Sequence, residues 1–286
     1  MSWHPNDLLT DADLVDYEAG ILAHFGQTSW QAKRTKALED WLFPILKGRG
    51  FDPYRLRTRL DCTRVWQYTG AAYTDVTAVV TDTTEDDLNL ATVFTTAGTD
   101  ALYIGSTIPF RGVFVRMQDA VSSAAGVLSV AYWNGHWESL AVADSTTQTA
   151  GKTFSAGGSV TWLLPADWMT RIVNGSTRLY WAKVTVSATP TAAKASQLAV
   201  IRASALRAPA TYRTLQLIMA EAPTSSEGPW GEKAAFYREE ADAALQRALL
   251  IIGGEFDTDA SDQVSETEQA QTPEEVGGGP WVLERA

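Results

Sequence analysis

The sequence predicts an α+β protein in which an α-helical bundle core is interrupted by an inserted antiparallel β-sandwich and followed by an extended C-terminal tail. Residues 101–187 hold short segments rich in β-branched and aromatic residues, several of which alternate with period two. Apolar residues recur at helical spacing on both sides of this region. Residues 255–286 are polar and acidic and show no apolar periodicity, which is typical of a flexible segment.

The predicted domains follow from these changes of pattern. Residues 1–70 and 205–254 form the helical core. Residues 71–204 form the inserted β-rich domain, whose sandwich spans about 101–187, and residues 255–286 form a flexible acidic C-terminal arm. Neither helical flank is long enough to build a core alone, so we expect the two flanks to pack together.

Two helices are predicted near the start of the chain. Thr10 is placed as the N-cap of the first helix with Asp13 three residues later, and Gly26 is its stop signal. The second helix starts after Ser29, and Pro44 is expected to kink or end it. Residues 51–70 alternate arginine with apolar residues, which fits an extended strand or an arm.

Strands are predicted in the middle of the chain at 101–105, 112–117, 126–133, 136–142, 159–163 and 178–186, with further strands at 76–80 and 90–95. Asn134 and Gly135 predict a type I′ turn, because both residues tolerate the positive φ that this turn needs. The strands on either side of them should therefore pair as a hairpin. Residues 197–205 fit either a last strand or a connector.

Two more helices are predicted at 211–222, after a break at Pro209, and at about 230–252. The second carries a stripe of small residues close to a heptad rhythm, which would allow another helix to approach closely. We therefore predict a subunit or domain contact through Ala241, Ala244, Leu245 and Ala248.

The charge and the cysteine content of the chain argue against some classes of function. The formal net charge is −11, of which residues 255–286 carry −8, and such an acidic balance argues against general nucleic-acid affinity. Residues 33–64 hold a local excess of basic residues, which fits a solvated face, a DNA contact or an acidic neighbour. The single Cys62 excludes an internal disulfide and suits a reducing compartment. We expect no secretory signal and no membrane span.

Motifs for catalysis are scarce. The three histidines lack metal-ligand spacing, and no nucleophile elbow, Walker loop or Rossmann fingerprint is present. The acidic run 82–87 lacks the spacing of a calcium-binding EF-hand. Glu138 and Asp167 are the acids in an aromatic strand context that leave a glycosidase pair open. The sequence therefore predicts no enzyme, no cofactor and no metal site.

Some segments resemble a known family. The start from Leu8 to Leu14, a second helix, a long excursion and a closing helix pair resemble the head–tail connector (adaptor) proteins of tailed bacteriophages. The middle resembles β-sandwich modules of phage virion proteins, and the matching segments are Ile108 to Gly112, Val127 to Gly135, Phe154 to Ser155, Val160 to Trp162, Pro165 to Trp168 and Leu179 to Val186.

The resemblance implies a structural virion protein made in the bacterial cytoplasm. Proteins of this family form rings, often of twelve copies, beneath the portal and bind portal, tail or stopper proteins. Packaged DNA passes through their channel without sequence-specific binding. The apolar residues Trp281, Val282 and Leu283 would then dock on the portal, with the acidic arm steering them.

The residues alone leave a second class of function open, that of a glycan-binding protein. A tail or baseplate protein could bind host-surface glycans on its β-sandwich through Trp133, Trp137 or Trp168, because large amphipathic rings suit sugar-binding faces as well as cores. Sugar binding needs these rings exposed on one face, whereas packing buries them. A hydrolase is the third and weakest class.

Overall fold

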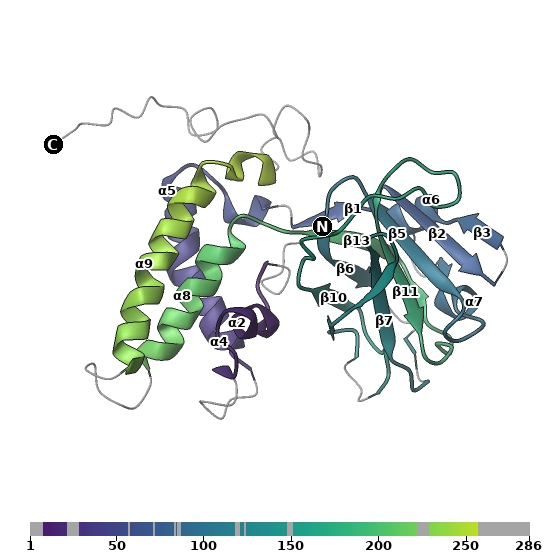
Figure 1. The fold of residues 1–286 in the computed structure, drawn as a ribbon, viewed down its shortest axis with the longest axis horizontal. Helices are drawn as coiled ribbons and strands as arrows, with labels where there is room; N and C mark the ends of the chain where they lie inside the picture. Colours follow the sequence, from purple (N-terminus) through teal and green to yellow (C-terminus); the bar gives the residue numbers. More distant parts are fainter. Residues whose placement is uncertain are drawn as a thin grey trace. The chain divides into compact units, whose positions relative to one another are not determined.

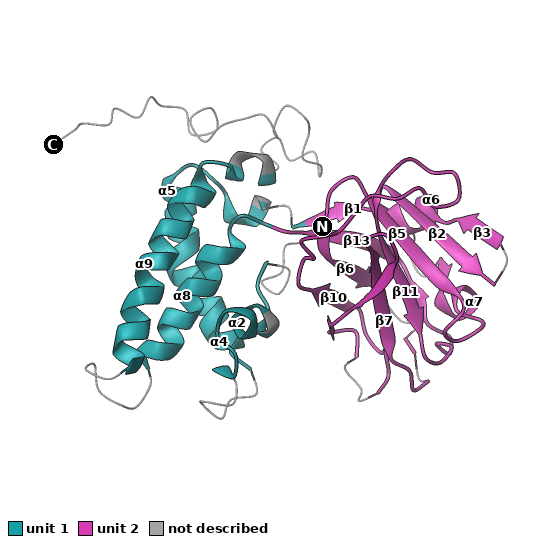
Figure 2. Ribbon diagram, in the orientation of Figure 1, with its two compact units in different colours: residues 1–58, 204–286 teal, residues 59–203 magenta. Residues whose placement is uncertain are grey.

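The computed structural model describes residues 8–21, 29–56, 58–70, 72–82, 84, 87–117, 121–122, 124–147, 151–221 and 229–256. The chain divides into two compact units, a helical unit of residues 1–58 and 204–286 and a β unit of residues 59–203 (Figure 2). Both ends of the chain therefore contribute to the helical unit. The β unit begins at Arg59, so residues 59–70 lie with the strands (Figure 1).

The prediction of an α+β protein with an α-helical bundle core and an inserted antiparallel β-sandwich was wrong. The described chain is mostly β, with thirteen strands in three antiparallel sheets, and most of its helices are short. Two misread regions account for the error. Residues 59–75 form three strands, and the first helix covers only Asp11–Tyr17 of the predicted span, of which residues 22–28 lie outside the described part.

The β unit contains all of the described strands. A five-stranded sheet has the order β1-β13-β6-β10-β9, a six-stranded sheet has the order β3-β2-β5-β11-β7-β8, and β4 pairs with β12. The strands are β1 Arg59–Asp61, β2 Arg64–Thr69, β3 Ala72–Asp75, β4 Leu88–Asn89, β5 Ala101–Ser106, β6 Phe110–Arg116, β7 Leu128–Trp133, β8 Trp137–Leu140, β9 Val142–Asp144, β10 Gly158–Trp162, β11 Tyr180–Val186, β12 Lys194–Ala195 and β13 Gln197–Arg202.

One hydrophobic core joins the two large sheets. Alternate side chains of both sheets enter it, among them Ile104 of β5, Val184 of β11 and Val113 of β6. Trp162 of β10 is 3% exposed and donates its indole N–H to the carbonyl oxygen of Phe110 at 3.1 Å. The opposite residues of the six-stranded sheet, such as Tyr103 and Trp181, therefore lie on its outer face, in a separate aromatic cluster.

The predicted hairpin is present, but its turn differs from the prediction. Trp133 of β7 pairs directly with Trp137 of β8, which leaves Asn134, Gly135 and His136 as the loop. Gly135 has a φ of 113°, whereas Asn134 is not among the residues with positive φ. The turn is therefore not type I′, which needs positive φ at both central residues.

Two predicted strands are short helices instead. Residues 76–80 contain most of α6 (Thr77–Thr81), and residues 90–95 contain α7 (Leu90–Val93). The side chain of Asn89 accepts a hydrogen bond from the backbone N–H of Ala91 at 3.0 Å, and Asp75 accepts one from that of Thr77 at 3.0 Å. These local hydrogen bonds from the backbone to side chains favour a helical turn over the β propensity of valine and threonine.

The helical unit is built from α2 Asp11–Tyr17, α4 Gln31–Lys36, the π-helix η1 Ala37–Leu42, α5 Phe43–Gly48, the 3₁₀ helix η2 Pro53–Arg55, α8 Arg207–Ala220, α9 Pro229–Leu249 and the 3₁₀ helix η3 Ile252–Glu255. A wider π turn precedes Pro44, the position at which the sequence predicts a kink or an end. Pro209 lies in the first turn of α8, where proline is tolerated, so it does not separate the helix from what precedes it.

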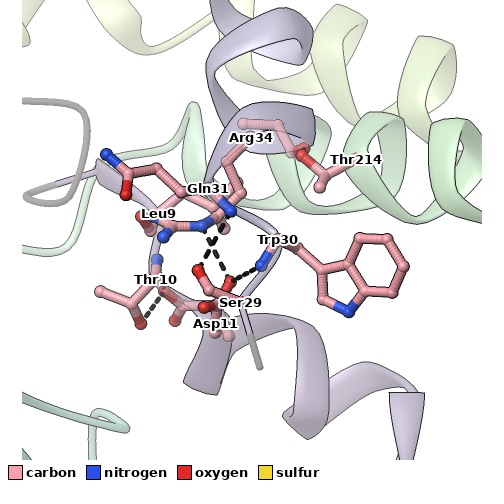
Figure 3. A network of polar contacts seen from close by, with 10 residues as sticks. Leu9, Thr10, Asp11, Ser29, Trp30, Gln31, Arg34 and Thr214 are labelled. Atoms are coloured by element: carbon pink, nitrogen blue, oxygen red, sulfur yellow. Dashed lines mark hydrogen bonds and ion pairs between the residues drawn. The ribbon is translucent and has the colours of Figure 1, made fainter. Parts of the chain in front are cut away.

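Polar contacts hold the N-terminal helices together (Figure 3). The predicted capping box is confirmed, because Asp13 accepts hydrogen bonds from the backbone N–H and the hydroxyl of Thr10 at 2.7 and 2.9 Å. The buried Arg34 of α4 donates to the carbonyl oxygen of Leu9 at 2.7 Å and forms an ion pair with Asp11 at 3.0 Å. Arg34 therefore links α4 to the start of α2.

Further ion pairs join the two ends of the chain within the helical unit. Arg207 of α8 lies 3.1 Å from the fully buried carboxylate of Asp13, and Lys233 of α9 pairs with Glu18. After α9, Phe256 packs in the core of this unit and Glu255 accepts hydrogen bonds from Ser204 and Ala205. The packed part of the helical unit thus reaches Phe256.

Candidate functional site

The strongest candidate site lies on the outer face of the six-stranded sheet, at the β7–β8 hairpin. Trp133 and Trp137 form a directly opposed cross-strand pair, so their side chains share one face of the sheet. Their ring centroids lie 5.6 Å apart at an angle of 69°, in an edge-to-face arrangement. Both rings are half-buried, so part of each remains open to solvent.

Arg171 covers this tryptophan pair from a neighbouring loop. Its guanidinium carbon lies 3.8 Å from the ring centroid of Trp133 and 5.6 Å from that of Trp137, which is cation–π geometry. No carboxylate pairs with Arg171 in the part of the chain that the structure describes. The cation is thus balanced by aromatic faces rather than by an acid.

The loop that carries Arg171 is fixed by backbone hydrogen bonds. The N–H of Met169 donates to the carbonyl oxygen of Trp133 at 2.8 Å. Arg171 and Leu179 exchange two backbone hydrogen bonds, of 2.9 and 3.1 Å, and the indole N–H of Trp181 donates to the carbonyl oxygen of Arg171 at 2.8 Å. These contacts place the guanidinium without using its own hydrogen-bond donors.

A row of further rings extends across the same face from Trp137. The ring centroid of Tyr103 of β5 lies 5.4 Å from that of Trp137 and 5.6 Å from that of Tyr73 of β3. The ring centroid of Tyr68 of β2 lies 4.8 Å from that of Tyr73. Burial, together with the neighbouring tyrosines, raises the pKa of Tyr103 above its ordinary value, and the charge of Arg171 acts in the opposite direction. Tyr103 therefore stays a neutral ring at physiological pH.

Acidic and amide groups gather at the same end of the hairpin. The side-chain N–H₂ of Asn134 donates to Glu138 at 2.5 Å and to Asp167 at 3.0 Å, and the hydroxyl of Tyr132 donates to Asp167 at 2.9 Å. The hydrogen bonds from Asn134 and Tyr132 hold the pKa of Asp167 below its usual range. Burial and the hydrogen bond to Asp167 raise the pKa of Tyr132 to about 12.

The structure thus brings together Glu138 and Asp167, the two acids that the sequence leaves open as a glycosidase pair. A glycosidase needs one carboxyl with a raised pKa to act as general acid. The pKa of Asp167 moves in the opposite direction, and both carboxylates are engaged by Asn134. This geometry suits hydrogen bonding to a polar ligand better than proton transfer.

Trp168 does not share the surface of the other two tryptophans. It is only 7% exposed and lies in the core between the sheets, where its ring centroid is 5.0 Å from that of Phe110 and 5.8 Å from that of Tyr132. Trp168 is therefore a packing residue, and a surface ligand would meet Trp133 and Trp137 alone.

The residues predicted to form a subunit contact are buried within the chain itself. Ala241, Ala244, Leu245 and Ala248 are each at most 4% exposed, and Leu245 and Ala248 pack with residues such as Leu42 in the core of the helical unit. Their burial requires no second copy. A subunit contact through these four residues stays a prediction.

Other candidate features add no further site. Trp281, Val282 and Leu283 lie outside the described residues, as do three positions of the acidic run 82–87. In the described segments no group of three or more His, Cys, Asp and Glu side chains is arranged to hold a metal ion. Burial raises the pKa of the Cys62 thiol to about 12, so it does not act as a nucleophile at neutral pH.

Comparisons with known proteins do not identify the chain. No protein-family model matches it, and a search of curated proteins finds no match either. Across the described ranges, no helix combines the length and the apolar character that a bilayer crossing requires.

Sequence reasoning singled out Trp133 and Trp137 but missed Arg171, Met169 and Tyr103. The site depends on a loop that follows the hairpin at a distance in sequence and on a strand that precedes it. The available signal was a methionine directly after Trp168 and an arginine three residues after it, a composition typical of binding surfaces.

Proposed function

We propose that this protein is a structural, non-catalytic component of a tailed-phage virion that joins the portal to the tail as a homo-oligomeric ring. The resemblance of the chain to head–tail adaptors suggests this role. The observation that carries it is exposed apolar surface on the helical unit: Phe236, Leu250 and Ile251 are 55%, 75% and 69% exposed. Surface of this kind marks a protein-binding region when the side chains cluster.

Phe236 lies on α9, on the side that faces away from its own core, and Leu250 and Ile251 directly follow the end of this helix at Leu249. Tyr237, Ala241, Ala244 and Leu245 face inward and are buried. Apolar side chains are thus exposed both on α9, at Phe236, and in the turn that follows it, at Leu250. A helix with one buried apolar side and further apolar residues on the other side is suited to pack against two neighbours.

The proposed partners are a second copy of the chain, the portal protein, and a tail or stopper protein. Packaged DNA would pass through the ring without sequence-specific contacts, because the chain has a net charge of −11 and lacks the dense positive charge of a DNA-binding surface. The site of assembly would be the bacterial cytoplasm, and the final location the head–tail interface of the virion.

Native mass spectrometry of the purified chain, alone and with the portal protein encoded alongside it, tests this proposal. We expect a ring of defined copy number, either alone or on the portal. The double variant Phe236→Glu and Leu250→Glu should weaken assembly by at least about tenfold, because burying two carboxylates in an interface is unfavourable. Val127→Glu, at a residue that is 63% exposed in the β unit, is the control and should assemble normally.

Two results would contradict the structural role. One is a chain that remains monomeric with and without the portal protein. The other is assembly that the Phe236→Glu and Leu250→Glu variant leaves unchanged.

A further inference from the structure

We propose that the Arg171, Trp133 and Trp137 surface is a binding site for an acidic saccharide. The sugar carboxylate would bind the guanidinium of Arg171, and the C–H face of the sugar ring would lie against the exposed parts of the aromatic rings. This inference does not rest on the proposed role at the head–tail junction, and either one can hold without the other.

The feature of this surface that points to an anion is Arg171. Its guanidinium stacks on Trp133 at 3.8 Å and has no acidic partner among the residues that the structure describes. An arginine stacked on a ring keeps the N–H groups at its edge available, and their fork matches the two oxygens of a carboxylate. The loop hydrogen bonds of Met169 and Arg171 hold the group in place before any ligand binds.

Apolar and aromatic side chains surround this cation. Met169 and Ile172 flank Arg171 in sequence and are 54% and 50% exposed, and the two tryptophan rings are half-buried beside it. Aromatic faces carry partial negative charge and attract the polarised C–H groups of a sugar ring. An aromatic and apolar platform beside a fixed cation therefore recognises a ring compound that carries a negative group.

The polar cluster at the end of the hairpin does not belong to this surface. Glu138 pairs with Tyr132 in the β7–β8 ladder, so these two side chains share the sheet face opposite that of Trp133 and Trp137. Asp167 bonds to Tyr132 and Asn134 and belongs to the same cluster. The acids of this cluster therefore do not oppose an anion that binds Arg171.

The charges disfavour the other anionic polymers. A single-stranded nucleic acid needs a track of positive charge along its backbone, whereas residues 59–203 hold ten basic and eleven acidic residues. A sugar acid presents ring C–H faces to the tryptophans and carboxylates to the cations of the same face, which are Arg171 and Lys183, whose ammonium lies 6.0 Å from the ring centroid of Tyr103.

The test uses oligogalacturonate and the same oligomer with its carboxylates converted to methyl esters, titrated into the full-length protein by calorimetry and tryptophan fluorescence. We expect the acid to bind and the ester to bind at least about tenfold more weakly, because the charge-assisted hydrogen bonds to Arg171 are lost. Arg171→Gln should remove the preference for the acid. Trp137→Ala should weaken both ligands.

Arg178→Gln is the matched control, since Arg178 is an exposed arginine of the same β unit and should leave the affinity and the preference unchanged. The proposal is overturned if neither oligomer binds wild-type protein at millimolar concentration, or if acid and ester bind equally. It is also overturned if poly-glutamate or a thymidine oligonucleotide binds this surface more tightly than oligogalacturonate.

Discussion

Close packing on the outer face of the six-stranded sheet depends on one small residue. A Cβ atom at Gly105 of β5 would lie 2.8 Å from the ring of Trp181, which is fully buried on the neighbouring strand β11. Only glycine leaves room for this ring. The indole N–H of Trp181 in turn fixes the carbonyl oxygen of Arg171. The position of the loop that carries Arg171 therefore depends on a glycine on a central strand.

Tyr132 gives the β unit a specific response to alkaline pH. Its folded-state pKa of about 12 exceeds the ordinary tyrosine pKa, which is about 10 in an unfolded chain. A raised pKa means that the neutral hydroxyl stabilises the fold below pH about 10, and that this stabilisation is lost as the pH rises through about 12. Tyr132→Phe should therefore unfold with a smaller loss of stability across this pH range.

Urea denaturation at several pH values between about 8 and 12 measures this effect. Tyr54→Phe, at an exposed tyrosine of the helical unit, is the control and should follow the wild-type curve. An identical pH dependence for Tyr132→Phe and wild type would show that the hydroxyl does not couple to folding.

At the scale of elements, the short N-terminal helices depend on polar contacts. Helix α2 spans seven residues, too few to be stable by itself, whereas α4 is the first part of a continuous helical stretch that runs through η1 and α5 to Gly48. Asp11 accepts from the backbone N–H of Trp30 at 3.1 Å as well as from Arg34, so one carboxylate holds the start of α4 against α2 (Figure 3). Tertiary contacts thus replace helix length as the source of stability.

Arg34→Met tests this dependence. The substitution keeps the apolar stem but removes the donors to Leu9 and Asp11, and it should lower the free energy of unfolding by about 2–3 kcal/mol. Chemical denaturation of the full chain measures it. Arg238→Met, at an exposed position of α9, is the control, with an expected change within about 0.5 kcal/mol. Equal effects of the two substitutions would contradict a structural role for the Arg34 network.

At the scale of the whole molecule, the β unit contains both of its large sheets within one continuous stretch of chain. Strand β2 pairs with β5 and β13 pairs with β6, so excision of residues 101–187 alone would remove a partner from each of the remaining strands β2 and β13. The boundaries at Arg59 and Ala203 keep every described strand and the shared core together.

The isolated fragment 59–203 should therefore fold by itself. We expect a cooperative thermal transition monitored by circular dichroism, with a free energy of unfolding of about 5–15 kcal/mol. The shorter fragment 101–187 should be molten or insoluble. A fragment 59–203 without a cooperative transition, under conditions in which the full chain has one, would contradict this prediction.

The sequence by itself determined the features that depend on near neighbours. The capping box of Thr10 and Asp13, the α9 helix, and the pairing of Trp133 with Trp137 all follow from residues a few positions apart. The central strands at 101–106, 128–133 and 180–186 were predicted close to their observed limits, because their β-branched and aromatic residues allow few alternatives. Of the candidate site, Trp133 and Trp137 came from the same local pattern, whereas Arg171, Met169 and Tyr103 did not.

Only the tertiary structure decided the proportion of strand to helix and which residues form the candidate site. Residues 59–69 alternate like an exposed arm, and their pairing with β13 and β5 makes them strands. Trp168 and Trp133 look equivalent in sequence, yet one fills the core and the other holds Arg171. Such choices depend on strand order and on which sheet face a loop covers, and these are set by contacts between residues far apart in the chain.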